Sequence, residues 1–248
     1  MTQGAIEALR ADRSVLLDLC SEMSDQDFKA ESGCEGWSAQ DVVAHMGALF
    51  WLVVDPSVLP DASALPTERA QDVYVEERRS WASAKVVEDY ESVSSEAIER
   101  LAGLEGQDFE LPLGDLGTYP ATLLPNAYSF DHYTHIREDL FLPRGPLTGD
   151  RPPSDEKRLT PAIEWIAAAL PQQNAAQISK LGGALDIVVT GPSARTIRVG
   201  EGETVARIES ESPSFIRWVT GRTSWDDAGV RTTGDESALT AARSLHVF

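Results

Sequence analysis

The chain has few cysteines and few basic residues. Its 248 residues include only two cysteines, Cys20 and Cys34, so a fold held together by a network of disulfides is excluded. It has 21 Lys and Arg against 40 Asp and Glu, which gives a formal net charge of −19 and a pI near 4.5. Such an acidic surface repels phosphate backbones and anionic lipids, so we expect no nucleic-acid partner and no membrane partner.

Long hydrophobic runs are also absent. The longest apolar run, residues 46–54, is far shorter than the ~20 residues that a transmembrane helix needs. The N-terminus shows no basic stretch followed by an apolar one, so we expect no signal peptide and a cytoplasmic location. The composition is otherwise that of a globular protein, with 42% hydrophobic and 25% charged residues. This length allows two modest domains or one large one.

Helical periodicity dominates the first 150 residues or so. Apolar residues recur at helical spacing, and a loop containing three prolines interrupts them over residues 56–66. Helices are predicted over residues 2–24, 39–54, 67–104 with a possible break near 80–84, and 119–141. The glycine-containing residues 103–118 are predicted to form a short hairpin or an irregular loop.

The pattern changes after a predicted bridging helix over residues 160–170, with Pro161 in its first turn. Short β-branched segments separated by glycine-rich turns then predict strands. Strands are expected at 184–189, 195–199, 204–208 and 229–234, and helices at 214–220 and from Asp235 onward. We predict an α+β fold in three parts: a helical bundle over residues 1–151, a bridging helix and linker over 152–179, and a small α+β domain over 180–248.

One helix start is well marked and leads to a histidine. Ser38 is a favourable N-cap, and Asp41 three residues later completes a capping-box pattern. The helix over residues 39–54 is almost entirely apolar, so we expect it in the centre of the bundle, with His45 in its middle turn. A lone histidine in such a helix is usually a core residue with one hydrogen bond, so His45 alone does not indicate a site.

A second helix carries an aspartate and a histidine four residues apart. Asp131 and His135 lie one above the other on a single helix face. Taken separately, the two form an ordinary helix pair worth ~0.3 kcal/mol. Their neighbours are apolar, however, and an unpaired carboxylate there is costly. With His45 brought over from the first helix, the two imidazoles and the carboxylate predict a divalent metal site with a position left for water or a thiolate.

The other histidines and the cysteines are weaker candidates. His132 points about 100° away from Asp131 around the helix, so we assign it a place beside the pocket or in helix packing. His246 is expected at the surface. Cys20 is expected in the core, and Cys34 has no histidine near it in the sequence, so neither is a strong candidate for a nucleophile.

Two segments together resemble a known family. The pattern Gly-Trp-Ser-x-x-Asp-Val-Val-Ala-His ends at His45, and Asp-His-Tyr-Thr-His follows about ninety residues later. This combination resembles the mycothiol-dependent maleylpyruvate isomerase family, in the DinB-like superfamily. The resemblance covers the whole chain, because Phe-Ile-Arg-Trp-Val-Thr-Gly-Arg at residues 215–222 is similar to an element of the family's sterol-carrier-like C-terminal domain.

The resemblance implies a DinB-like four-helix bundle with a zinc site, followed by a small sterol-carrier-like α+β domain. The implied zinc ligands are His45, Asp131 and His135. Because the family's usual carboxylate is glutamate, Asp131 is a departure. Its side chain is one methylene shorter, so it must bring the helix closer to the ion or bind through a water.

Two arginines near the reaction are also implied. The family's C-terminal arginine falls on Arg222, which would offer a planar charged donor to a substrate carboxylate or an anionic intermediate. The alternative is a structural role, in which Arg222 caps carbonyls or pairs with Asp226 or Asp227. A further arginine of the family corresponds to Arg79 or Arg78.

The family uses mycothiol, a low-molecular-weight thiol of actinobacteria. Zinc lowers the pKa of a thiol, and three protein ligands leave an open position for the sulfur. The first hypothesis is therefore a zinc-dependent, mycothiol-using isomerase or S-transferase for a small electrophile, acting as a monomer or homodimer. One alternative is a non-catalytic protein that binds a small ligand or thiol conjugate at a degenerate metal site. Another is a hydrolase that uses metal-bound water.

Overall fold

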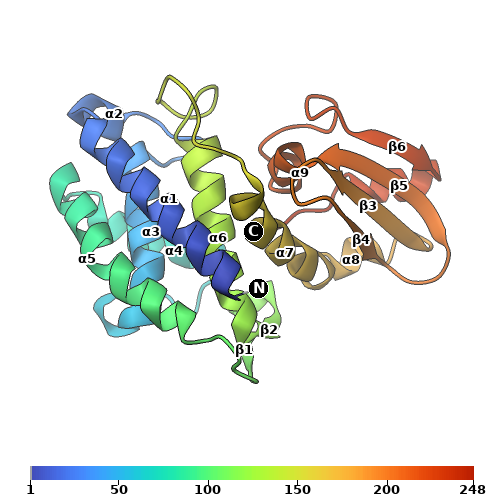
Figure 1. Ribbon diagram of the computed structural model, residues 1–248, viewed down its shortest axis with the longest axis horizontal. Helices are drawn as coiled ribbons and strands as arrows, with labels where there is room; N and C mark the ends of the chain where they lie inside the picture. The colour runs from blue at the N-terminus through green and yellow to red at the C-terminus, as the bar shows by residue number, and fades with distance from the viewer. Residues whose placement is uncertain (1) are drawn as a thin grey trace.

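A computed structural model describes residues 2–248 and contains a bundle of helices joined to a small sheet (Figure 1). The predicted α+β fold, with a helical part followed by a small sheet part, is confirmed. Met1, the first residue of the predicted bundle, lies outside the described residues, and the domain limits at 151 and 180 remain a prediction. Among residues 2–248, no helix is long and apolar enough to cross a membrane.

Four long helices form the first part: α1 (Thr2–Glu22), α3 (Ala39–Val54), α5 (Ser83–Ala102) and α6 (Leu124–Thr134). Helix α3 packs against α5, and α1 packs against α6 and α5. A shared core lies between them, in which the ring of Phe50 is 5.7 Å from that of Tyr90 and 5.8 Å from that of Tyr128. The apolar α3 is therefore central, as its composition predicts.

Further elements connect these helices: α2 (Asp25–Lys29), the 3-10 turns Pro56–Val58, Gly114–Leu116 and Ala121–Leu123, and α4 (Thr67–Arg78). Because α4 ends at Arg78 and α5 begins at Ser83, the predicted helix over residues 67–104 is broken where expected. The glycine-containing segment holds the predicted hairpin, in which β1 (Glu110–Pro112) pairs antiparallel with β2 (Thr118–Pro120).

The prediction of one helix over residues 119–141 was wrong at both ends. Tyr119 lies in β2, and the helix starts at Leu124. This start places Pro125 in the first turn, where a missing N–H costs nothing, whereas an earlier start would put it in the interior. At the other end the helix widens into a π turn, His135–Asp139, in which Leu140 N–H donates to the His135 carbonyl at 3.2 Å.

Helix α7 (Glu156–Gln173) is longer than the predicted helix over residues 160–170. Asp155 is its N-cap and accepts from Arg158 N–H at 3.1 Å, so Pro161 lies inside the helix instead of in its first turn. The helix packs against α6 and α1 on one side and against α9 (Ser212–Val219) on the other. In Figure 1 it lies between the bundle and the sheet, and it thus joins the two parts.

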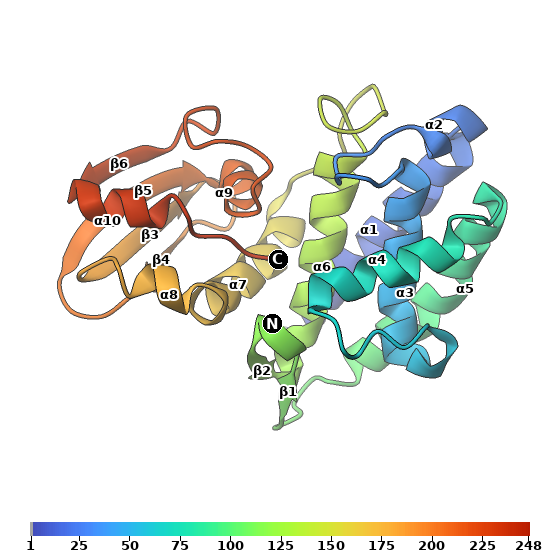
Figure 2. The same cartoon turned by 180° about the vertical axis from the view of Figure 1, so that it is seen from behind.

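The second part is a four-stranded sheet in the order β4-β3-β5-β6: β3 (Ala184–Thr190), β4 (Arg195–Val199), β5 (Thr204–Glu211) and β6 (Arg231–Gly234). All four predicted strands are present. Strands β3 and β5 are parallel, and the other pairs are antiparallel. One face packs against α7, α9 and α10 (Glu236–Ala242), and α8 (Ala175–Ile178) lies beside it (Figure 2). Alternate residues on β4 are exposed, as in a sheet with one solvated face.

The segment after α10 returns to the junction between the two parts. His246 N–H donates to Asn174 Oδ1 at 2.9 Å, and Asn174 Nδ2 donates to the His246 carbonyl at 2.7 Å. Val247 N–H donates to the Val219 carbonyl at 2.9 Å. These bonds bring Phe248 close to α7, where Figure 1 marks the end of the chain between α6 and α7.

Candidate metal centre

The start of α3 is held by the predicted capping box. Ser38 N–H donates to Asp41 Oδ2 at 2.9 Å, and Asp41 N–H donates to Ser38 Oγ at 3.2 Å. Two backbone donors of the first turn are thus satisfied, which fixes where the helix begins. His45 follows one turn after Asp41, and its buried side chain faces α6.

The structure brings the three predicted ligands together. His45 Nε2 lies 3.0 Å from Asp131 Oδ1, and His135 Nε2 lies 3.4 Å from the same oxygen. The rings of the two histidines are 4.9 Å apart and meet edge to face. In a tetrahedral site with ligands at ~2.0–2.1 Å from zinc, neighbouring ligand atoms are about 3.3–3.4 Å apart. The two separations to Asp131 Oδ1 are thus close to those of a tetrahedral site, and all three candidate ligand atoms lie within 4.8 Å of one another.

The chemistry of the donor set also fits a cation. Asp131 Oδ2 is buried and has no hydrogen-bond partner among residues 2–248, so one oxygen of this carboxylate remains available. The shorter aspartate is accommodated, because α3 and α6 approach closely enough for direct contact between Asp131 and His45. Without an ion, the same contacts are charge-assisted hydrogen bonds from two imidazoles to one carboxylate.

His135 is oriented by a residue that the sequence analysis missed. Its Nδ1 lies 2.8 Å from Asp139 Oδ2, at the end of the π turn that follows α6. With a metal ion bound, a proton held on Nδ1 by this carboxylate would leave the lone pair of Nε2 free to coordinate the ion. Metal-binding histidines are commonly held by a carboxylate in this way. Asp139 repeats the four-residue spacing from Asp131 to His135, which is the one signal that could have indicated it.

Asp139 is in turn the partner of Arg222. The Arg222 Nε lies 3.0 and 3.1 Å from the two carboxylate oxygens of Asp139, and Arg144 Nε lies 3.5 Å from Oδ1. The side chain of Asp139 is fully buried and that of Arg222 is 15% exposed. Arg222 thus pairs with Asp139 in the π turn after α6, and not with its sequence neighbours Asp226 and Asp227. Its contact with the candidate ligand His135 runs through this carboxylate.

Two glycines allow other segments to close over Asp139. A Cβ on Gly33 would lie 2.6 Å from Asp139 Oδ1, and one on Gly145 would lie 2.3 Å from the Asp139 carbonyl oxygen. Gly33 N–H also donates to that carbonyl at 2.8 Å. Any side chain at either position would push Asp139 away, so both glycines are required for its burial.

The charges at the centre shift its pKa values strongly. Burial alone would raise the pKa of Asp131, but the imidazoles of His45 and His135 hold it well below its usual value. Burial would lower the pKa of His135, but Asp131, with a further contribution from Asp139, raises it well above its usual value. His135 and Arg222 likewise keep the pKa of the buried Asp139 below its usual range. The centre therefore favours ionised carboxylates.

Cys34 lies closer to this centre than its sequence position suggests. Cys34 has no histidine near it in the sequence, as stated above, but its Sγ lies 3.6 Å from His135 Nδ1 in the structure. Cys34, His135 and Asp139 form a second group with metal-ligand spacing, on the opposite nitrogen of the same histidine. Cys20 is buried as predicted, and burial raises its pKa to about 12.

Two other predicted residues make their hydrogen bonds to groups other than the candidate ligands. Arg79 donates to the Gly36 carbonyl at 2.9 Å and lies 3.5 Å from Asp41, so it contacts the loop before α3. Its predicted catalytic role, like that of Arg78, stays a prediction. His132 is fully buried, with Nδ1 3.0 Å from the Tyr128 carbonyl and Nε2 3.2 Å from the Tyr90 hydroxyl. It packs between helices, which is one of the two places predicted for it.

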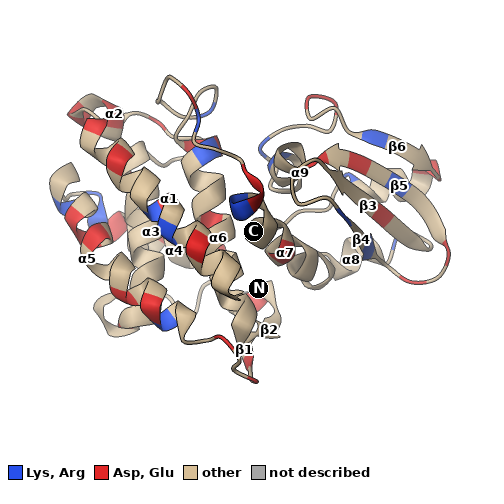
Figure 3. Cartoon of the chain, in the orientation of Figure 1, with Lys and Arg blue, Asp and Glu red and all other residues tan. Residues whose placement is uncertain are grey.

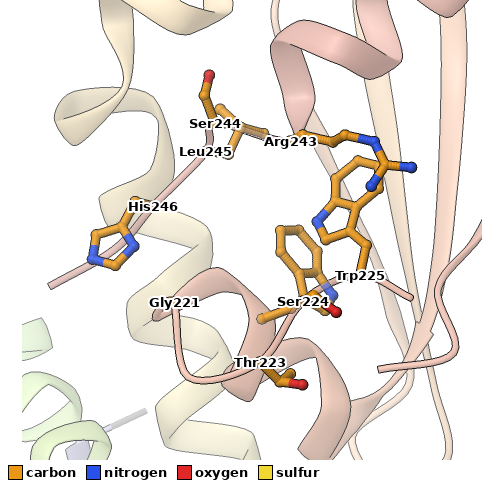
Figure 4. Close-up of a pocket in the computed structure, with 9 residues that line it drawn as sticks. Gly221, Thr223, Ser224, Trp225, Arg243, Ser244, Leu245 and His246 are labelled. Carbon is orange, nitrogen blue, oxygen red and sulfur yellow. The ribbon is translucent and has the colours of Figure 1, made fainter. Parts of the chain in front are cut away.

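The three candidate ligands line a pocket of about 560 Å³ between the bundle and the end of the chain. Its walls include Trp37 and α4 on one side and Arg222 on another. His246 lines it too and is partly exposed, so the predicted surface position holds only in part, because the segment after α10 folds back over α7. A second hollow of about 320 Å³ also reaches His246, with Trp225 and Arg243 on its opposite side (Figure 4).

Charge on the rest of the molecule is distributed differently. Figure 3 shows acidic residues spread over α1, α2 and α5 and over strands β3 and β5. In contrast, Arg222 and Arg144 both face the single carboxylate of Asp139, the partner of His135. The acidic residues that give the chain its net negative charge are therefore spread over both parts of the molecule and do not gather at the candidate centre.

Two family models match the chain. The mycothiol maleylpyruvate isomerase N-terminal domain matches residues 9–122, and the MDMPI C-terminal domain matches residues 160–241. The chain belongs to the mycothiol maleylpyruvate isomerase family. No curated protein sequence matches this family member significantly.

Solved structures agree with this family membership. A crystal structure of the mycothiol-dependent maleylpyruvate isomerase matches with a TM-score of 0.60 and 19% identity, over 95% of this chain and 94% of that chain. A structure of a histidine-to-alanine mutant of that isomerase matches with a TM-score of 0.58 and 18% identity, over the same shares of the two chains. At these identities, the likeness shows that the fold is shared.

Proposed function

We propose that this protein is a zinc-dependent enzyme that uses mycothiol to isomerise or conjugate a small electrophile. The observation that carries the proposal is the convergence of His45 Nε2, Asp131 Oδ1 and His135 Nε2, with separations of 3.0 and 3.4 Å, in a pocket large enough for a ligand. Membership of a family named for a mycothiol-dependent isomerase supports the choice of thiol.

In this proposal the three side chains hold the zinc ion, whose chemical contribution is to lower the pKa of the thiol so that its thiolate exists at neutral pH. Asp139 holds a proton on Nδ1 of His135 and so keeps Nε2 free as a ligand. Arg222 acts as a positioning residue, because its Nε lies 3.0 and 3.1 Å from the two oxygens of Asp139 and so holds the carboxylate that orients His135.

The test is a screen of small electrophiles, with and without mycothiol, on protein whose metal content is known. We expect about one equivalent of zinc and turnover that depends on the thiol. His135→Ala should lose both, because it removes a ligand and the contact with Asp139. Metal-free protein under zinc-replete conditions would favour the alternative of a non-catalytic binding protein, and turnover without thiol would favour a hydrolase.

His132→Ala is the matched control. His132 lies on the same helix and is also buried, but its hydrogen bonds are to Tyr128 and Tyr90, and its nearest approach to a candidate ligand is 3.6 Å, from Nδ1 to Asp131 Oδ2. This variant should lose stability through the two lost hydrogen bonds and should still bind zinc. Equal loss of zinc in both variants would mean that general damage to α6, and not loss of a ligand, explains the result.

A further inference from the structure

An apolar groove leads away from the candidate metal centre between α3 and α6. Leu49 and Leu52 follow His45 on one face of α3, about 6 and 10 Å along the helix axis. On α6, Leu124 precedes Asp131 by two turns and lies on the same helix face. These three leucines line the pocket and are only partly buried. The surface next to the candidate ligands is therefore hydrocarbon on both helices.

The two rows of side chains run beside each other. The Tyr128 hydroxyl donates to the Leu49 carbonyl at 2.8 Å, which ties α6 to α3 one turn away from the candidate ligands. Leu52 packs against a small apolar cluster that includes residues of α4. Leu113 and Leu116, from the segment between β1 and β2, also line the pocket. An apolar molecule can therefore bury its surface here on several sides.

The arginines that line the pocket are already paired. Arg222 directs Nε and Nη2 at the carboxylate of Asp139, and its Nη1 donates to the Thr220 carbonyl at 3.4 Å. Arg69 lies 3.2 Å from Asp72 and is 75% exposed, so water screens its charge. Among the described residues that line the pocket, no other arginine and no lysine is present. A substrate carboxylate therefore finds no free guanidinium to bind it as a fork.

The remaining charges near the groove repel an anion. Glu35, Glu68 and Asp72 line the pocket as well. Burial raises the pKa of Glu68, although Arg69 partly opposes this rise. The carboxylates of Asp115 and Asp72 raise the same pKa further, as expected where negative charges lie close together. A second carboxylate brought in by a substrate meets this repulsion too.

His246 does not supply the missing cation. Burial lowers its pKa, and the positive charge of Arg222 lowers it further, so its imidazole is neutral near pH 7. Its ring lies 4.3 Å from that of Phe248, edge to face, and both side chains line the pocket. The end of the chain thus adds an uncharged, largely aromatic wall.

We propose that the electrophile of this protein is an uncharged molecule with an apolar body, and not a carboxylate substrate such as maleylpyruvate. The apolar body lies in the groove between α3 and α6, beside Leu49 and Leu52, with its reactive carbon toward the candidate ligands. This inference rests on the proposed function for the reaction, and it adds the class of electrophile, which the proposed function leaves open.

Two ketones that differ by one carboxylate test the inference. Benzylacetone and its para-carboxylate are both saturated, so they bind without reacting. Each is titrated by calorimetry into protein of known zinc content. The uncharged ketone should bind about tenfold tighter or more, because an unpaired charge in an apolar groove is costly. Equal or tighter binding of the carboxylate would overturn the inference, as would a failure of benzylacetone to bind.

Leu52→Arg gives the groove the free cation that it lacks. This variant should raise the affinity for the carboxylate, relative to that for benzylacetone, about tenfold, as for one new charged hydrogen bond. Leu17→Arg makes the same change at a partly buried leucine of α1 outside the pocket, and it should leave this ratio unchanged. An equal shift in both variants would overturn the inference, because net charge and not the groove would then set the preference. Circular dichroism checks that both variants fold, and the wild-type comparison stands without them.

Turnover separates this inference from the proposed function. The reactive pair is benzalacetone and its para-carboxylate, supplied with mycothiol. The thiol sulfur bonds to the carbon β to the carbonyl, the π electrons of the C=C bond move toward the carbonyl oxygen, and the α-carbon takes up the proton that the thiol loses. We expect kcat/KM to be about tenfold higher or more for benzalacetone, in line with binding.

The outcomes are distinguishable. Equal turnover of the two enones, or more efficient isomerisation of maleylpyruvate, would overturn the inference and leave the proposed function standing. If benzylacetone binds preferentially but no electrophile is turned over with mycothiol, the preference of the groove stands and the proposed function fails.

Discussion

Asp139→Asn is the sharpest test of how the candidate centre is held. Asparagine keeps the shape of the side chain and removes its charge. In the structure this one buried carboxylate faces His135 at 2.8 Å, Arg222 at 3.0 and 3.1 Å, and Arg144 at 3.5 Å. The substitution therefore leaves a largely buried guanidinium without its counter-charge and weakens the hold on Nδ1 of His135.

Two magnitudes follow from these contacts. Removing one partner of a buried ion pair costs about 3–5 kcal/mol. For a protein of this size, each kcal/mol lowers the melting temperature by about 2–4 °C, so we expect a fall of about 6–20 °C. Loss of the carboxylate that orients a metal-binding histidine typically weakens metal affinity about 10–100-fold. Zinc affinity is measured by competition with a chromophoric chelator, and stability by thermal unfolding of the metal-free protein.

Asp12→Asn provides the matched control. Asp12 is also fully buried, and it pairs with Arg137 at 2.8 and 3.1 Å and with Arg158 at 2.8 Å, away from the candidate ligands. It should lower stability by a similar amount and leave zinc affinity unchanged. If Asp139→Asn binds zinc as tightly as wild type does, Asp139 does not orient His135. If Arg222→Lys then abolishes turnover at full zinc occupancy, Arg222 acts on the substrate directly.

His45→Ala should abolish zinc binding while circular dichroism stays that of the folded protein, because the bundle has a large core without this side chain. Zinc uptake should release a proton, and affinity should fall on acidification, because Asp131 and Asp139 raise the pKa of His135 in the metal-free state. The same raised pKa stabilises the folded metal-free protein at pH values below the pKa of histidine in the unfolded chain, and this stabilisation is lost as the pH rises through the higher pKa of His135 in the folded protein. Calorimetry measures the proton release, and unfolding at several pH values measures the stability. Cys34→Ser should keep zinc and thiol-dependent turnover, because the sulfur faces Nδ1 and not Nε2; zinc loss on metal analysis would make Cys34 a ligand.

Most of the successful predictions depend on neighbouring residues, and the approach of His45 to Asp131 from another helix is the exception. The capping box of Ser38 and Asp41 forms because both partners lie in one turn, and the strands follow from β-branched residues between glycine turns. The helix starts that we predicted near prolines were wrong in two opposite ways. Pro161 is tolerated inside α7, whereas Pro125 moves the start of α6 to Leu124. A local rule does not tell how much strain the surrounding packing absorbs.

The amino-acid sequence by itself determined the α+β class, the order of helices and strands, and the stacking of Asp131 and His135 on one helix face, because hydrophobic period and four-residue spacing are local properties. Only the tertiary structure decided what meets that face. Arg222 reaches Asp139 from 83 residues away, and His246 reaches the pocket through Asn174. Contacts between segments so far apart depend on how whole helices pack, since a helical pattern specifies which side is buried and not which partner covers it.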